Sequence, residues 1–102
     1  KNNQEEYQDC GMHKTIELIG NKWTLPILYS LFSGKKRFSE LERELNVSPR
    51  TLSTRLDQLE KDDIVTRKVY PVVPVRVEYA LTPKGHSLNK IIEMMVKWGE
   101  QH

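Results

Sequence analysis

The chain has 102 residues, of which 37% are hydrophobic and 29% charged, and its net charge is +2. These values fit one soluble globular domain spanning residues 1–102 and exclude an extended disordered chain. No apolar stretch reaches the ~18–20 residues that a bilayer-spanning helix needs, and the polar first residues do not predict a secretion signal. A lone cysteine, Cys10, excludes an internal disulfide framework, so we expect a cytoplasmic protein without a membrane partner.

The first half of the chain predicts two short helices. Residues 15–19 form an amphipathic segment that stops at Gly20, a residue common at helix ends. Residues 23–32 are dense enough in apolar side chains for a buried helix, and Pro26 is acceptable because it falls in the first turn. Residues 33–36 are expected to end this helix.

The next segment predicts a helix–turn–helix over residues 39–61. Residues 39–45 form a short helix with leucines four positions apart, and Val47 in the following turn is expected to fill the space between the two helices. Ser48 is a good N-cap with Pro49 at the first helical position, and the second helix runs to about Lys61. Two helices separated by about three residues have the spacing of this motif.

From Ile64 the apolar period changes from 3.6 to 2, which predicts a β-hairpin, or wing, over residues 64–81 with a proline-containing connector. Residues 64–79 hold Arg67, Lys68 and Arg76 against Glu78 alone, a net charge of +2. A basic hairpin directly after a helix–turn–helix favours nucleic-acid binding. The strand register, and therefore which cations point toward DNA, stays open.

A last helix is predicted to begin at Pro83 with Thr82 as its N-cap, and it carries a broad apolar stripe. One small domain can hardly bury all of this stripe, so part of it is expected to meet a second chain. An ordinary core helix is the competing interpretation.

A helical wheel of residues 49–61 turns the leucines at 52, 56 and 59 toward the core and leaves the opposite side free. Arginine can hydrogen-bond guanine in the major groove, and a helix N-terminus favours a phosphate. The residues expected to contact DNA are Ser48, Arg50, Thr51, Thr54 and Arg55 from this helix, and Arg67, Lys68 and Arg76 from the hairpin.

Several separated motifs occur together in order. They are Ile19-Gly20-Asn21-Lys22-Trp23-Thr24, Arg37-Phe38-Ser39-Glu40-Leu41, Ser48-Pro49-Arg50-Thr51-Leu52-Ser53 and Tyr79-Ala80-Leu81-Thr82-Pro83-Lys84-Gly85. With these motifs the chain resembles the HxlR-type transcription regulators, relatives of the MarR winged-helix group, over roughly residues 10–98. It departs from the family at Gly11, where proline is common, and at Asp62-Asp63, where a glycine is usual. The second departure suggests a modified turn before the wing.

The resemblance implies a mainly helical winged helix–turn–helix fold, with a three-helix core, a wing, and dimerisation helices at residues 10–20 and 83–100. It implies a homodimer on a palindromic double-stranded operator, and no cofactor. The interface residues expected on this basis are Ile16, Ile19, Leu88, Ile91, Ile92, Met95 and Trp98.

Cys10 matches a cysteine that senses electrophiles or oxidants in some family members. That chemistry needs a thiolate, which the first turn of a helix and nearby Lys14 and His13 would favour. An inert structural cysteine is the other interpretation.

Three further functions compete with DNA binding. A winged helix can serve only as a protein–protein interaction module, and a dimer groove can bind a small molecule that acts as inducer. An enzyme is a poor fit because Cys10 and His13 have no orienting third group, and the Cys and His spacing does not predict a metal site.

Overall fold

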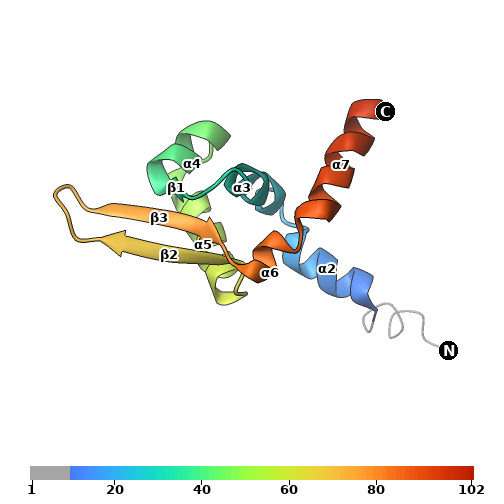
Figure 1. Cartoon of the computed structure of the whole chain (residues 1–102), viewed down its shortest axis with the longest axis horizontal. Coiled ribbons are helices and arrows are strands. Elements are labelled where there is room, and N and C mark those ends of the chain that lie inside the picture. The colour runs from blue at the N-terminus through green and yellow to red at the C-terminus, as the bar shows by residue number, and fades with distance from the viewer. Residues whose placement is uncertain (1–9) are drawn as a thin grey trace.

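The computed structural model describes residues 10–102. Its elements, in chain order, are α2 (Gly11–Ile19), α3 (Thr24–Leu31), β1 (Lys36–Arg37), α4 (Phe38–Leu45), α5 (Pro49–Lys61), β2 (Val65–Tyr70), β3 (Arg76–Leu81), α6 (Pro83–His86) and α7 (Asn89–Gln101). The β2–β3 hairpin projects from one side of the helical body, and α2 and α7 lie at the opposite end (Figure 1). The predicted mainly helical winged helix–turn–helix fold is confirmed.

The helix–turn–helix consists of α4 and α5, and its turn has the predicted construction. Asn46 takes the left-handed conformation with φ 52°, which asparagine tolerates better than most residues. Val47, in this turn, is buried in the core, with 6% of its surface exposed. The Ser48 hydroxyl accepts the Thr51 N–H at 3.2 Å, so Ser48 is the N-cap of α5.

The hairpin belongs to a three-stranded antiparallel sheet in the order β1–β3–β2. Strand β1 was not predicted, because a two-residue strand has no periodicity and the sequence there indicates only the end of a helix. The register pairs Arg67 with Tyr79 and Lys68 with Glu78. Directly paired residues share one face of a sheet, so Arg67 and Lys68 lie on opposite faces.

The predicted single last helix is wrong, because the chain turns between α6 and α7. Thr82 caps α6 as predicted: its hydroxyl accepts the Gly85 N–H at 3.0 Å and donates to the Asp63 carbonyl at 2.6 Å. These bonds hold the start of α6 against residues 63–64, just before β2. The Leu88 N–H then donates to the Gly85 carbonyl at 3.1 Å and closes a tighter turn. After this turn α7 packs against α3.

This turn splits the apolar stripe of the last helix into two parts. Leu88 and Ile92 are 8% and 3% exposed, and they pack into the protomer's own core together with Ile19. The prediction that Ile19, Leu88 and Ile92 face a second subunit is therefore wrong, since their surface is already covered.

Within residues 10–102 no helix is long and apolar enough to cross a membrane.

The contact between α6 and Ile64, the residue before β2, leaves no room for a side chain at Gly85. A Cβ there would lie 2.3 Å from the Ile64 carbonyl oxygen, whereas a Cβ at Gly99 in α7 would meet nothing within 4 Å. Gly85→Ala should lower the free energy of unfolding by about 1–3 kcal/mol because the backbone has to shift. Gly99→Ala should be neutral or raise it by up to about 1 kcal/mol, because alanine favours the helix. Urea denaturation of both variants checks this, and equal stabilities would contradict the described packing.

Candidate nucleic-acid interface

The amino-terminal half of α5 presents a polar surface because its leucines face inward. Leu52, Leu56 and Leu59 are between 0% and 2% exposed, as the helical wheel predicts. Arg50 and Thr54 are exposed on the other side, and Arg55 is partly exposed. Among the described residues, neither arginine forms an ion pair, so both guanidinium groups are available to a ligand.

The hydroxyl groups of this helix are already partly engaged. Ser48 donates to the Thr51 hydroxyl at 3.0 Å as well as capping the helix, and the Thr54 hydroxyl donates to the Arg50 carbonyl at 3.0 Å. Thr51 therefore keeps its hydroxyl proton for an outside acceptor. Ser48 and Thr54 keep acceptor capacity only, which limits what they can offer to phosphate oxygens.

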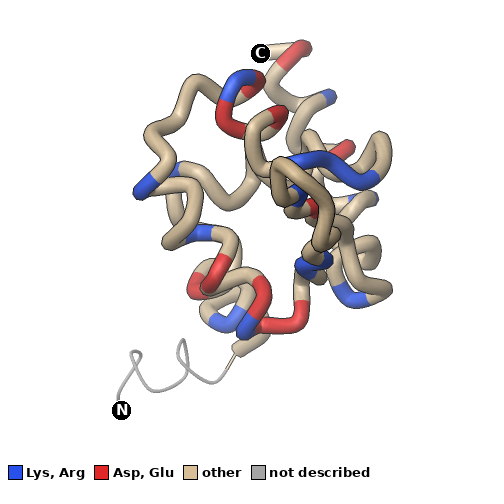
Figure 2. Tube along the Cα trace, turned by 90° about the vertical axis from the view of Figure 1, so that its left-hand side faces the viewer, with Lys and Arg blue, Asp and Glu red and all other residues tan. Residues whose placement is uncertain are grey.

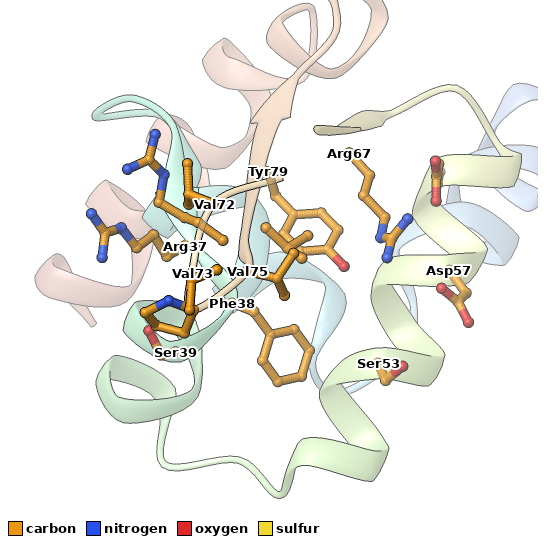
Figure 3. Close-up of a pocket in the computed structure, with 14 residues that line it drawn as sticks. Arg37, Phe38, Ser39, Ser53, Asp57, Arg67, Val72, Val73, Val75 and Tyr79 are labelled. Carbon is orange, nitrogen blue, oxygen red and sulfur yellow. The ribbon is translucent and has the colours of Figure 1, made fainter. Parts of the chain in front are cut away.

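Of the three predicted wing cations, Arg67 alone points toward α5. Figure 3 shows its side chain between β2 and α5, directed toward the side of the helix that carries Asp57. Arg67 hydrogen-bonds the Tyr79 hydroxyl, and this lowers the Tyr79 pKa, but burial of the ring is the larger effect and raises that pKa overall. Tyr79 therefore stays protonated and holds the guanidinium at the inner side of the wing.

Lys68 and Arg76 lie on the other face of the hairpin and are engaged there. The Arg76 guanidinium stacks over the Tyr70 ring at 4.2 Å, and the Lys68 ammonium lies 5.0 Å from the same ring centre. Arg76 Nε is also 3.2 Å from Glu78 Oε2. The register, which the sequence left open, thus places Arg67 on one face of the hairpin and Lys68 and Arg76 on the other.

A cleft of about 900 Å³ separates the wing from α4 and α5. Its polar lining includes Arg37 from β1, Ser39 from α4, Ser53 from α5, and Arg67 and Arg76 from the hairpin (Figure 3). The acidic side chains of Asp57 and Glu60 also line it, farther along α5 than Ser53.

Sequence reasoning missed Arg37, Ser39 and Ser53 as candidate site residues. Ser53 could have been found, because it lies one turn beyond Arg50 on the flank of the same helix. Arg37 lies in β1, which pairs with β3 of the wing, and Ser39 lies in α4, so only the tertiary structure brings them to the cleft.

Basic and acidic positions are interspersed over the side of the molecule from which the wing projects (Figure 2). Several cations are neutralised locally. Lys36, for example, pairs with Glu44, and the hydrogen bonds from Lys36 and Ser30 lower the pKa of that carboxyl. Among residues 10–102 the ion pairs take up Lys35, Lys36 and Arg76, so most Lys and Arg side chains, Arg50 and Arg55 among them, keep no ion-pair partner and can contribute to binding of a polyanion.

At the opposite end of the molecule lies an exposed apolar surface, with residues on α2 and on α7. On α7 it follows one helical stripe of Ile91, Met94, Met95 and Trp98, with exposed fractions of 44–70%. On α2 it includes Ile16 and Met12, at 45% and 61%. Met12 and Met94 were not predicted as interface residues.

Cys10 is exposed, is not in a disulfide, and is the N-cap residue of α2. Its carbonyl oxygen accepts the Lys14 N–H at 3.4 Å, which closes the first turn of that helix. The thiol therefore lies at the start of one of the two helices that carry the exposed apolar surface.

Comparison with known proteins agrees with this architecture. YybR of Bacillus subtilis (strain 168), described as an HTH-type transcriptional regulator, is 40% identical over 100% of this chain and 82% of its own length. The structure of the redox regulator HypR in its oxidized form is 41% identical and superposes with a TM-score of 0.86, covering 91% of this chain and 97% of that one. Reduced YodB from B. subtilis is 37% identical with a TM-score of 0.79, over 90% of this chain and 92% of its own.

The model of the HxlR-like helix-turn-helix family matches residues 18–102. This match takes in every described element from the end of α2 onward, including the helix–turn–helix, the wing and α7. The relatives are named as transcription regulators and not as enzymes. The chain belongs to the HxlR-like helix-turn-helix family of transcription regulators.

Proposed function

We propose that this protein is a cytoplasmic, homodimeric regulator that binds a specific double-stranded DNA operator by inserting α5 into the major groove. One observation carries the proposal. The buried leucine stripe of α5 turns Arg50 outward in the first turn of this helix. Among the described residues Arg50 has no ion-pair partner. A guanidinium in this position can form a two-fold hydrogen bond to guanine O6 and N7.

The cleft between α5 and the wing supports the same docking. If α5 enters the major groove and the wing reaches the neighbouring minor groove, the sugar–phosphate strand between the two grooves has to pass through this cleft. Its outer lining suits that strand, since Arg37 supplies positive charge and Ser39 and Ser53 supply hydroxyl donors. Asp57 and Glu60 repel phosphate, so we infer that the strand lies toward the outer part of the cleft.

The apolar surface of α2 and α7 supports a homodimer. Ile91, Met94, Met95 and Trp98 form one continuous stripe whose exposure would be costly in a monomer. A two-fold dimer through this surface would present two copies of α5, and two recognition helices suit a palindromic site with half-sites about one helical turn apart. Each protomer keeps its own core, because Ile19, Leu88 and Ile92 are already buried within it.

We also propose that Cys10 makes the regulator responsive to oxidants or electrophiles. Support comes from its exposed position at the start of α2 and from the similarity to HypR, a redox regulator. Oxidation of two thiols to a disulfide releases two electrons and two protons, and the second thiol would come from another subunit or from a small thiol. A disulfide at Cys10 would shift α2 and would thereby change the spacing of the two α5 helices in the dimer.

Selection from random duplex DNA, followed by affinity measurements on the enriched sequence, tests the DNA-binding proposal. Arg50→Ala should weaken binding by about 1–3 kcal/mol and relax the preference at one base pair. Lys61→Ala removes the same charge from the far end of α5 and should change affinity by less than about twofold. If no sequence is enriched, or if Arg50→Ala binds like Lys61→Ala, the alternative of a protein–protein interaction module is favoured instead.

The dimer is tested by sedimentation of the double variant Ile91→Glu/Met95→Glu. Two buried charges would oppose association, so this variant should sediment as a monomer and lose most of its operator affinity. Val69→Glu changes a wing residue of comparable exposure (45%, against 44% and 47%) and should remain dimeric. A wild-type chain that sediments as a monomer at micromolar concentration would contradict the proposal.

The redox proposal is tested by operator affinity before and after treatment with diamide, in wild type and in Cys10→Ala. Diamide takes up the two electrons and two protons, and the wild-type affinity should change while that of Cys10→Ala does not. Non-reducing electrophoresis separates a disulfide between subunits from a mixed disulfide with a small thiol. No change in wild type, or the same change in both proteins, would overturn the role of Cys10.

A further inference from the structure

Two carboxylates of α5 border the cleft between this helix and the wing. Asp57 and Glu60 lie one helical turn apart, line the cleft together and are exposed to solvent. Among the described residues neither of them forms an ion pair. Left uncompensated, two negative charges beside the path proposed for the sugar–phosphate strand would lower the affinity for DNA, because like charges across an interface repel.

Arg67 is placed to compensate this negative charge. Strand β2 packs against α5, and Figure 3 shows the Arg67 side chain reaching from β2 toward the side of the helix that carries Asp57. Lys68, the other cation of β2, lies on the opposite face of the hairpin, with its ammonium 5.0 Å from the Tyr70 ring centre. Of the two β2 cations, therefore, only Arg67 faces α5.

The Tyr79 hydroxyl keeps the Arg67 guanidinium at this position. Tyr79 is the cross-strand partner of Arg67, is 5% exposed, and lies against Phe38 with the ring centres 6.4 Å apart. Burial is the main cause of the raised Tyr79 pKa, and the hydrogen bond that its hydroxyl accepts from Arg67 opposes this effect. The charges of Asp57 and Glu60 raise the same pKa further. The guanidinium and both carboxylates thus lie close enough to act on one hydroxyl.

We propose that Arg67 is the internal counter-charge of α5 and not a DNA ligand; this inference rests on the proposed function. One positive charge against the two carboxylates leaves a net charge of −1 on this wall of the cleft in place of −2. The Tyr79 hydroxyl holds the guanidinium inward, so a phosphate has to compete with Asp57 and Glu60 for its N–H groups. This role differs from the direct DNA contact that the sequence predicts for Arg67.

A double-mutant cycle on a duplex enriched with the wild-type protein tests this role. Arg67→Met keeps the stem of the side chain but removes its charge, so the operator affinity should fall about 3- to 10-fold. In a chain that already carries Asp57→Asn and Glu60→Gln, the same substitution should cost less than about twofold, because no negative charge is left to compensate. Lys68→Met is the matched control. It removes an equal charge from the other face of β2 and should have the same effect in both backgrounds.

Binding of a phosphate by Arg67 would give a different result. Arg67→Met would then cost the same in both backgrounds, and the slope of log affinity against log salt would change by about 0.9 for the lost contact. That outcome would overturn the inference. It would leave the proposed function intact as long as Arg50→Ala still weakens binding and relaxes the preference at one base pair.

A measurement without DNA checks the contact on which the inference depends. In NMR spectra of protein with ¹³C-labelled tyrosine, the signal of the hydroxyl-bearing ring carbon of Tyr79 should move in Arg67→Met, because the hydroxyl loses its donor. The same signal should stay in place in Lys68→Met. An unmoved Tyr79 signal in Arg67→Met would contradict the described contact, whether or not a duplex is enriched.

Discussion

The burial of Leu52, Leu56 and Leu59 sets the orientation on which the proposed function depends. Each of these side chains contributes about 2 kcal/mol by leaving water, and together they allow α5 only one rotation about its axis. That rotation determines which side chains of α5 remain outside. Arg50 and Thr54 are exposed because the leucines occupy the inner side of the helix. The orientation of the helix, and not a contact to a neighbouring side chain, places Arg50 outside.

A second constraint places the wing relative to α5. The Thr82 hydroxyl bonds both the Asp63 carbonyl and the Gly85 N–H, and Gly85 lies directly against the Ile64 carbonyl. The base of the hairpin is thus fixed to the start of α6, and the ladder from Val65–Leu81 to Tyr70–Arg76 extends this position outward. Arg67 then faces α5, whereas Lys68 and Arg76 face away. The same junction turns α7 toward α3 and so leaves Met95 and Trp98 exposed.

Much of this arrangement could be predicted from the sequence, because local signals are strong where one residue type has one physical role. The Ser48-Pro49 start of α5, the leucine stripe, and the change of period at Ile64 each belong to a single element, and all three predictions are confirmed. What could not be predicted depends on tertiary placement. Three features depend on how elements pack: the register that separates Arg67 from Lys68, the pairing of Arg37 in β1 with β3, and the burial of Leu88 and Ile92 inside the protomer. The apolar pattern of the last helix could not show which of its residues face the protomer's own core.

NMR titration of ¹⁵N-labelled protein with an enriched operator duplex shows directly whether α5 and the wing form the DNA-binding surface. If this surface binds DNA, the largest backbone shift changes should fall on residues 48–55, on the start of α4 and on the wing, while α7 should change little. Changes concentrated on α2 and α7, with α5 unaffected at saturating DNA, would contradict it.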